Sequence, residues 1–296
     1  MTSLTYRRSL GETAFSWFNL LFMLTLCFVT LYPFIYILLA SVSDPALMAK
    51  YRGMLFFPQG FSLEAYKAVL DNPMITTGYR NTLFYVAAGT VINLIMTTLG
   101  AYALSRPNVY FKNHIMLIIV ITMVFNGGLI PSFLLINNLG MLNTPWALLL
   151  PGAISSFNLI IMRTAFQGIP VSLEESARID GANDWVILSR IIIPLSMPVI
   201  AVMILWYAVG HWNSYFNALV YLRDRELFPL QLVLREILIS NSTDNMTTGA
   251  AAGDRMDIGI TIKYATIIVS TLPILVLYPF LQKYFVQGVL IGALKE

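Results

Sequence analysis

The feature that most limits which fold this sequence can adopt is a set of long runs without a charged side chain. Of its 296 residues, 57% are hydrophobic and 11% are charged, whereas soluble domains carry about 25% charged residues. A membrane-spanning helix needs roughly 20 mostly apolar residues. The runs therefore predict an all-α membrane protein with six transmembrane helices, and we expect one transmembrane domain over residues 1–296. The expected spans cover about residues 15–40, 82–105, 115–136, 146–163, 191–213 and 264–285.

Two of these spans share one uncharged run, from Ile115 to Met162, which is too long for a single helix. Residues 137–145 in its middle contain the Asn, Gly and Pro residues of a turn, so we divide the run there. The first run exceeds the 7–15-residue core of a signal peptide, and we expect it to remain in the protein. Cys27 lies in that run and is the only cysteine, which excludes a disulfide within the chain.

The segments between the spans suggest an orientation. Six spans place both termini on one side of the membrane. Arg7 and Arg8 precede the first span, and the preference of Lys and Arg for inner loops favours cytoplasmic termini. The largest outer loop then covers residues 214–262, and its small, polar centre at residues 241–254 suggests a mobile segment.

What the sequence lacks limits its function. The six span interiors contain no Asp, Glu, Lys or Arg, although an ion-coupled carrier usually keeps an ionisable group there. There is no G-x-x-x-x-G-K-[ST] phosphate loop, so the chain cannot hydrolyse ATP by that route. The net charge of +3 gives no indication of nucleic acid binding. If the chain moves a solute against a gradient, another subunit must supply the energy.

A charged stretch interrupts the apolar sequence at residues 170–190. Pro170 signals a helix start, and Glu174 and Glu175 would lie in the first turn, where the helix dipole favours negative charge. Gly181 permits the left-handed backbone that ends a helix, and a second short helix can begin at Asp184. The stretch predicts a helix–turn–helix at the membrane surface. An ordinary amphipathic interfacial helix is the alternative.

The same stretch resembles a known signature. Glu175-Ser176-Ala177, then Gly181 after three residues, then Ile191-x-Ile193-Pro194 after nine more, is similar to the EAA motif of permease subunits of bacterial ABC importers, E-A-A-x3-G-x9-I-x-L-P. Ser176 replaces an Ala and Ile193 replaces the Leu. Further segments resemble the carbohydrate-uptake, maltose-transporter branch: Asp180-Gly181-Ala182, residues 139–144, 147–151 and 288–295. Residues 125–131 resemble the sub-branch for complex oligosaccharides.

This resemblance implies a type I ABC importer permease fold in the bacterial cytoplasmic, or inner, membrane, surrounded by membrane lipid. It implies as partners an ABC ATPase dimer, a second permease subunit of different sequence, an extracytoplasmic solute-binding protein and an oligosaccharide substrate. ATP and Mg would bind to the ATPase, and no cofactor or metal to this chain, which would not be an enzyme. The implied ATPase-coupling residues are Glu174, Glu175, Ala177, Asp180, Gly181 and Ala182.

Specific roles follow from the same resemblance. Glu175 would contact a basic group of the ATPase, Gly181 would form the turn, and Ala177 would pack in the ATPase cleft. Residues 287–296 would reach between the ATPase subunits, with a frayed terminus as the alternative. The outer loop, residues 221–263, would enter the solute-binding protein, with a passive linker as the alternative.

Sugar contacts are expected from aromatic rings, which stack on C–H faces, and from amides, which bind hydroxyls. The substrate-pathway candidates are Asn126, Trp212, Asn213, Tyr215 and Asn217. The stretch around Trp212 could instead be an aromatic belt at the membrane interface. Asn126 precedes Gly127 and Gly128, which would break the third span. Such a break lines a cavity or is buried in protein, and close helix packing by small residues is the alternative.

We therefore expect half of the translocation pathway of an ATP-driven oligosaccharide importer. The alternatives are the permease of an ABC importer for a non-sugar solute and, in another class, a non-transporting membrane scaffold or receptor subunit. An ion-coupled carrier is disfavoured by the uncharged spans.

Overall fold

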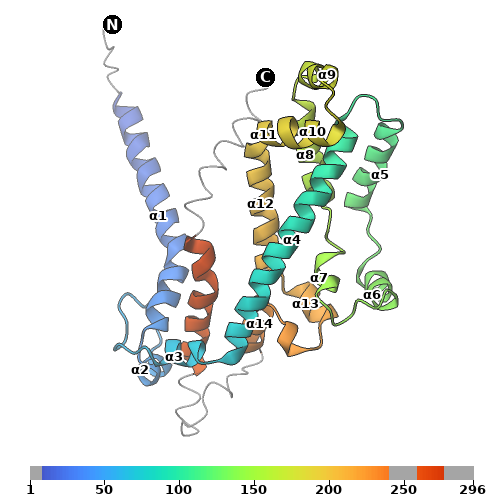
Figure 1. The fold of residues 1–296 in the computed structure, drawn as a ribbon. Coiled ribbons are helices and arrows are strands. Elements are labelled where there is room, and N and C mark those ends of the chain that lie inside the picture. The colour runs from blue at the N-terminus through green and yellow to red at the C-terminus, as the bar shows by residue number, and fades with distance from the viewer. Residues whose placement is uncertain (1–8, 240–258, 277–296) are drawn as a thin grey trace. The chain divides into compact units, whose positions relative to one another are not determined.

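The computed structural model describes residues 9–239 and 259–276. These residues form helices and connecting segments, with no strand among them, as Figure 1 shows. The all-α class expected from the sequence is confirmed. The chain divides into two compact units, residues 1–71 with 243–269 and residues 72–242 with 270–296, and each is described by itself.

The first unit contains the long helix α1, which begins at a capping box. Ser9 Oγ accepts from the Glu12 backbone N–H at 3.2 Å, and Glu12 Oε2 accepts from the Ser9 N–H at 2.8 Å. A small core of Ala40, Met48 and Leu55 lies at the C-terminal end of α1. The remaining surface of α1 is apolar and exposed, which suits a helix in a membrane. The helices of this unit are α1 (Leu10–Ser41), α2 (Pro45–Lys50), α3 (Glu64–Leu70) and the first part of Gly259–Val276.

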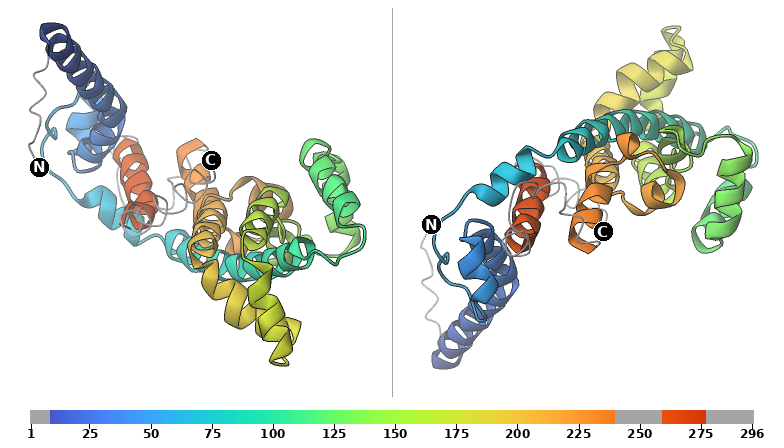
Figure 2. Two further views of the ribbon diagram at one scale, coloured as in Figure 1. Left: turned by 90° about the horizontal axis from the view of Figure 1, so that it is seen from above. Right: turned by 90° about the horizontal axis from the view of Figure 1, so that it is seen from below.

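The second unit is built around α4 (Pro73–Ser105), whose 33 residues extend for about 50 Å. Helices α8 (Ser156–Gln167) and α12 (Met197–Trp212) pack on α4 and on each other, as Figure 2 shows from two sides. Their shared core includes Met162, Phe166 and Met203. The other elements are α5 (Lys112–Val124), α6 (Leu129–Asn138), α7 (Trp146–Leu149), α9 (Val171–Ile179), α10 (Asp184–Ile187), the π-helix η1 (Leu188–Ile192), α11 (Ile193–Leu195), α13 (Phe216–Tyr221), the 3-10 helix η2 (Arg225–Leu227) and α14 (Leu230–Ile239).

Three described helices are long and apolar enough to cross a membrane: α1, α4 and Gly259–Val276. Two bent pairs bring the number to as many as five. The helices α5 and α6 meet at 112° across residues 125–128, where the sequence predicts a break. The segment Asp184–Leu195 meets α12 at 84°. The straight part of the fifth span thus begins at Met197 rather than at residue 191, next to Pro194 and Pro198, which cannot donate helical hydrogen bonds.

The fourth expected span, residues 146–163, is not one helix. Its run is interrupted by Pro151 and Gly152, so that α7 ends at Leu149 and α8 begins at Ser156. Helix α8 rises only about 18 Å, which is less than the roughly 30 Å of the hydrocarbon layer. The end of the sixth expected span, residues 277–285, lies outside the described residues, so the count of six remains a prediction.

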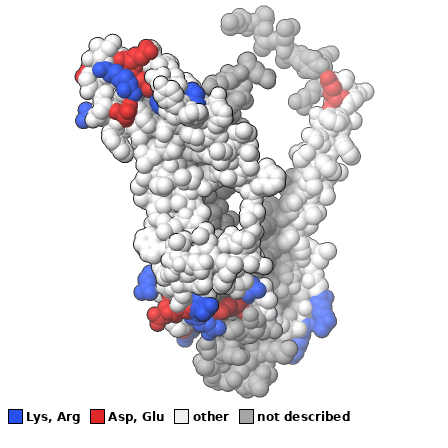
Figure 3. All heavy atoms as spheres, turned by 90° about the vertical axis from the view of Figure 1, so that its right-hand side faces the viewer, with Lys and Arg blue, Asp and Glu red and all other residues white. Residues whose placement is uncertain are grey.

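Charged side chains of the second unit gather at its two ends. Figure 3 shows one group around α9 and another at the opposite end, with a broad band free of Lys, Arg, Asp and Glu between them on this face. A band of this kind fits the hydrocarbon layer, and the two charged ends fit the two aqueous sides.

Candidate functional site

The helix–turn–helix predicted at residues 170–190 is present as α9, a turn at Gly181 and α10. The Gly181 N–H donates to the Arg178 carbonyl at 3.1 Å, and the Ala182 N–H donates to the Ala177 carbonyl at 2.9 Å. These two bonds are the Schellman motif that closes a helix. Gly181 has a φ of +83°, and an added Cβ would meet no atom within 4 Å. The turn therefore needs glycine for its left-handed backbone, not for space.

A buried ion pair fixes α9 to the rest of the unit. Glu174 is 4% exposed and pairs with Arg106, the residue that follows α4. Arg106 also donates to the Phe166 carbonyl at 3.2 Å, near the end of α8, and its guanidinium lies 4.9 Å from the Tyr102 ring centroid. One arginine thus joins the ends of three helices. Glu174, expected to couple to the ATPase, points into its own chain.

A second ion pair holds the two short helices together. Arg178 Nη2 on α9 lies 2.5 Å from Asp184 Oδ1 on α10, and Tyr102 donates to the same oxygen at 3.4 Å. Both charged side chains are more than half exposed, so water weakens the pair. It joins the last turn of α9 to the first turn of α10.

The remaining coupling candidates separate into two sets. Ala177 and Ala182 are partly buried and pack against the unit's own core, whereas Glu175, Asp180 and Gly181 are exposed. The small side chain of Ala177 lets α9 approach its own chain, and the expected contact of Ala177 with the ATPase cleft stays a prediction.

The exposed apolar residues of this region are Ile179, at 87% exposure, and Trp185, at 68%. Ile179 follows Glu175 by four residues and shares its helix face. Neither residue is among the coupling residues expected from the sequence, although the four-residue spacing from Glu175 is a signal that identifies Ile179.

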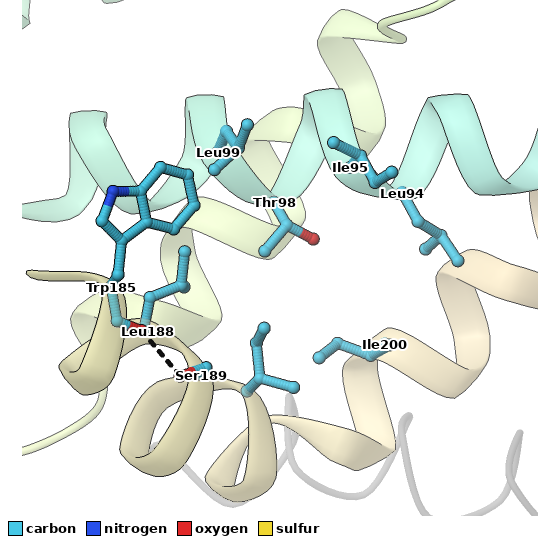
Figure 4. A pocket seen from close by; sticks show the side chains of 9 residues that line it. Leu94, Ile95, Thr98, Leu99, Trp185, Leu188, Ser189 and Ile200 are labelled. Carbon is cyan, nitrogen blue, oxygen red and sulfur yellow. Dashed lines mark hydrogen bonds between the residues drawn. The ribbon is translucent and has the colours of Figure 1, made fainter.

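An apolar hollow of about 400 Å³ lies between α4 and the bent segment from α10 to α12. Figure 4 shows Trp185 at one side of it and Thr98 pointing in from α4, with Ser189 Oγ donating to the Trp185 carbonyl at 2.7 Å. A wall this apolar suits a hydrophobic group and offers a sugar few partners. It is lined by Leu94, Ile95, Thr98, Leu99, Trp185, Leu188, Ser189, Ile193 and Ile200.

The substrate-pathway candidates differ in their exposure. Trp212 is 6% exposed and packs edge-on against Tyr79, with 6.2 Å between ring centroids. Its ring packs on α4 in this chain, and the expected contact of Trp212 with a sugar stays a prediction. Asn213, Tyr215 and Asn217 are exposed after the end of α12.

Asn126 lies in the exposed break between α5 and α6. Its Oδ1 accepts from the Gly128 N–H at 3.0 Å, which stabilises the break as an Asx turn. Among the described residues, no group of three or more His, Cys, Asp or Glu side chains could hold a metal ion.

Comparisons with known proteins identify the family. The family model described as "Binding-protein-dependent transport system inner membrane component" matches residues 96–291. Protein LplC of Bacillus subtilis (strain 168) is 42% identical over 281 residues, which cover 94% of this chain and 93% of LplC. The polygalacturonan/rhamnogalacturonan transport system permease protein YtcP of the same strain is 40% identical over 281 residues, which cover 93% of this chain and 96% of YtcP.

A solved structure agrees. In the crystal structure of a bacterial ABC transporter involved in the import of the acidic polysaccharide alginate, one chain matches with a TM-score of 0.86 and 36% identity, covering 95% of this chain and 100% of that chain. Permease subunits of this kind are integral membrane proteins and are not themselves catalytic. The chain belongs to the family of binding-protein-dependent transport system inner membrane components, and it is a permease subunit of an ABC importer with the type I fold.

Proposed function

We propose that this chain forms half of the translocation pathway of an ATP-driven oligosaccharide importer and receives its driving force through α9. YtcP is a transport system permease for polygalacturonan/rhamnogalacturonan, and the importer of the matching structure takes in alginate. These relatives support a sugar polymer fragment as the substrate. Fragments of acidic polysaccharides are the first class to test.

The single observation that carries the coupling role is the rigid mounting of an exposed helix face. Glu175 and Ile179 are exposed on α9, while Glu174 on the inward side is paired with Arg106. A partner that contacts the outward face therefore pushes on a short helix that is held to the core by an ion pair. Since Arg106 follows α4 and bonds to the end of α8, the displacement passes directly to two helices of the core.

Each coupling residue has a distinct part in this proposal. Glu175 contacts a basic group of the ATPase, and Ile179 packs into its cleft. Asp180 and Gly181 end the helix, Ala177 and Ala182 seat it on the core, and Glu174 positions it. Asn126, Asn213, Tyr215 and Asn217 remain the proposed contacts along the substrate pathway.

The proposed partners are an ABC ATPase dimer that binds ATP and Mg, a second permease of different sequence and an extracytoplasmic solute-binding protein. We place both termini in the cytoplasm. The tail at residues 287–296 and the loop centre at residues 241–254, proposed to meet the ATPase and the solute-binding protein, lie outside the described residues. The pathway would open inward at rest and outward when ATP closes the ATPase dimer.

Gentle purification of the chain from its native membrane, with its partners identified by mass, tests the assembly. We expect an ATPase, a second permease and a solute-binding protein. Screening that binding protein against acidic oligosaccharides, neutral oligosaccharides and non-sugar solutes then tests the substrate. Preference for a non-sugar solute would overturn the sugar assignment, and absence of an ATPase would overturn the coupling role.

A further inference from the structure

Polar side chains connect α4, α12 and the non-helical segment between α7 and α8, residues 150–155. Asn93 on α4 donates from Nδ2 to the Gly152 carbonyl at 2.6 Å, and its Oδ1 lies 2.6 Å from His211 Nε2 on α12. Asn93 is 1% exposed. We call this set of contacts the first rung. It joins one residue of each helix to one backbone group of the interrupted span.

A second rung repeats the arrangement one helical turn away. Thr97 Oγ1 on α4 lies 2.7 Å from the Tyr207 hydroxyl on α12, and that hydroxyl accepts from the Ser155 N–H at 3.3 Å. Thr97 is 0% exposed and Tyr207 is 8% exposed. Asn93 and Thr97 are four residues apart, as are Tyr207 and His211, so the rungs stack along two antiparallel helices.

The donors and acceptors of the first rung determine which nitrogen of His211 carries a proton. A backbone carbonyl only accepts, so the amide nitrogen of Asn93 must face Gly152, and Oδ1, which also only accepts, must face His211. His211 therefore donates from Nε2. The histidine ring also lies against the α4 backbone, because a Cβ on Gly89 would come within 2.3 Å of Nε2.

Membrane depth explains why these bonds matter. Backbone N–H and C=O groups outside a helix need partners in the hydrocarbon layer, where an unsatisfied group costs several kcal/mol. The interruption at residues 150–155 leaves such groups, and the rungs satisfy two of them from neighbouring helices. Neutral donors and acceptors do this within a part of the chain that has no charged side chain.

We propose that Asn93, Thr97, Tyr207 and His211 are positioning residues that make α4, α12 and residues 150–155 one rigid body. The segment from Asn213 to Asn217 follows α12 directly and is carried by this body. The inference rests on the proposed function, since rigidity serves transport only in a chain that changes conformation. It assigns to the polar rungs the task of making the pathway segment move together with α4 when α9 is displaced.

Spin labels test the rigidity without knowledge of the substrate. In the complete importer, with Cys27 replaced by Ser, labels at Ile154 and Ile204 report the interrupted segment and α12; both side chains are exposed, at 43% and 40%. We expect a narrow distance distribution without nucleotide, and the same mean distance after trapping with ATP and vanadate. A changed mean distance would overturn the rigid body.

Variants of the rungs sharpen the test. His211→Leu removes the donor to Asn93, and we expect a distribution roughly two-fold broader. His211→Gln keeps an N–H donor, and we expect it to restore the narrow distribution, which a loss of packing alone would not allow. If the Leu variant fails to assemble, Tyr207→Phe decides, because it removes one hydroxyl and leaves the Ser155 N–H unsatisfied. Narrow distributions in the non-conservative variants that assemble would contradict the proposal.

The same sample separates this inference from the proposed function. Absence of ATP hydrolysis by the fully assembled wild-type complex would refute the proposed function. The nucleotide-free distributions would still decide whether the rungs hold the three segments together.

Discussion

The two places where α4 is tied to its neighbours use different chemistry. At the C-terminal end of α4, Arg106 joins α4 to α8 and α9 through an ion pair and a charged hydrogen bond. Closer to the middle of α4, Asn93 and Thr97 join this helix to α12 through neutral groups. A charge costs less near water than in the hydrocarbon layer, so the ion pair suits the charged end of the unit and the neutral rungs suit the uncharged band.

This difference also separates a site that is open to a partner from a site that is closed within the chain. The charged site leaves one helix face free, with Glu175 and Ile179 exposed, and so can receive a partner. The neutral site directs its donors and acceptors to its own chain. Comparing substitutions in the two regions tests this division, and the expected effects on the free energy of unfolding run from several kcal/mol to nearly none.

The largest loss is expected from Glu174→Ala. It leaves Arg106 buried without its counter-ion, and breaking a buried pair in this way costs roughly 3–5 kcal/mol. Denaturant unfolding of the purified chain in detergent measures the loss. The adjacent Glu175→Ala is the matched control, expected within about 0.5 kcal/mol of wild type because Glu175 is exposed. Equal losses in both variants would refute the distinction between the inward and outward acids.

The next effect tests the neutral region. Gly89→Ala introduces a Cβ that would come within 2.5 Å of His211 Cε1, and overpacking of this kind costs roughly 1–3 kcal/mol. Gly210→Ala is its control, since a Cβ there meets no atom within 4 Å. Thermal unfolding should rank Gly89→Ala below both wild type and the control. The opposite ranking would mean that His211 does not lie against α4.

A smaller effect is expected from Gly181→Val, because the left-handed backbone costs a non-glycine residue roughly 1–2 kcal/mol. Gly181→Asn should lose less, since Asn tolerates this conformation. The two variants can be compared by thermal unfolding and by ATP-driven uptake in the complete importer. If Val and Asn behaved alike, the positive φ of the turn would not be the reason for glycine.

The smallest effect on stability is expected from Ile179→Ser, within about 0.5 kcal/mol, because the side chain is exposed. The same change should weaken binding of the ATPase, since it removes apolar surface from the proposed contact. Co-purification and unfolding measured on one preparation separate these outcomes. A chain that loses stability and keeps its ATPase would reverse the assignment.

Local patterns in the sequence predicted the local structure. Gly181, which follows Ala177 after three intervening residues, predicted the left-handed end of α9, and Asn126-Gly127-Gly128 predicted the break between α5 and α6. In both places the conformation depends on residues close together in the chain. The coupling motif could therefore be located by its spacing alone.

Contacts between distant residues were not predictable in this way. Asn93 and His211 are separated by 118 positions, and no periodicity in either helix indicates that they meet. For the same reason, the sequence did not reveal that Glu174 turns inward to Arg106 while Glu175 faces outward. The interruption of the fourth span was missed because Pro151 and Gly152 stand within an otherwise continuous apolar run.

The most direct test of the central claim is ATP-driven uptake by the complete importer carrying Glu175→Arg. The account predicts that uptake and co-purification of the ATPase are lost, while the unfolding temperature of the chain stays at the wild-type value. Retention of both uptake and ATPase binding by a stably folded variant would show that the outward face of α9 does not couple the permease to its energy source.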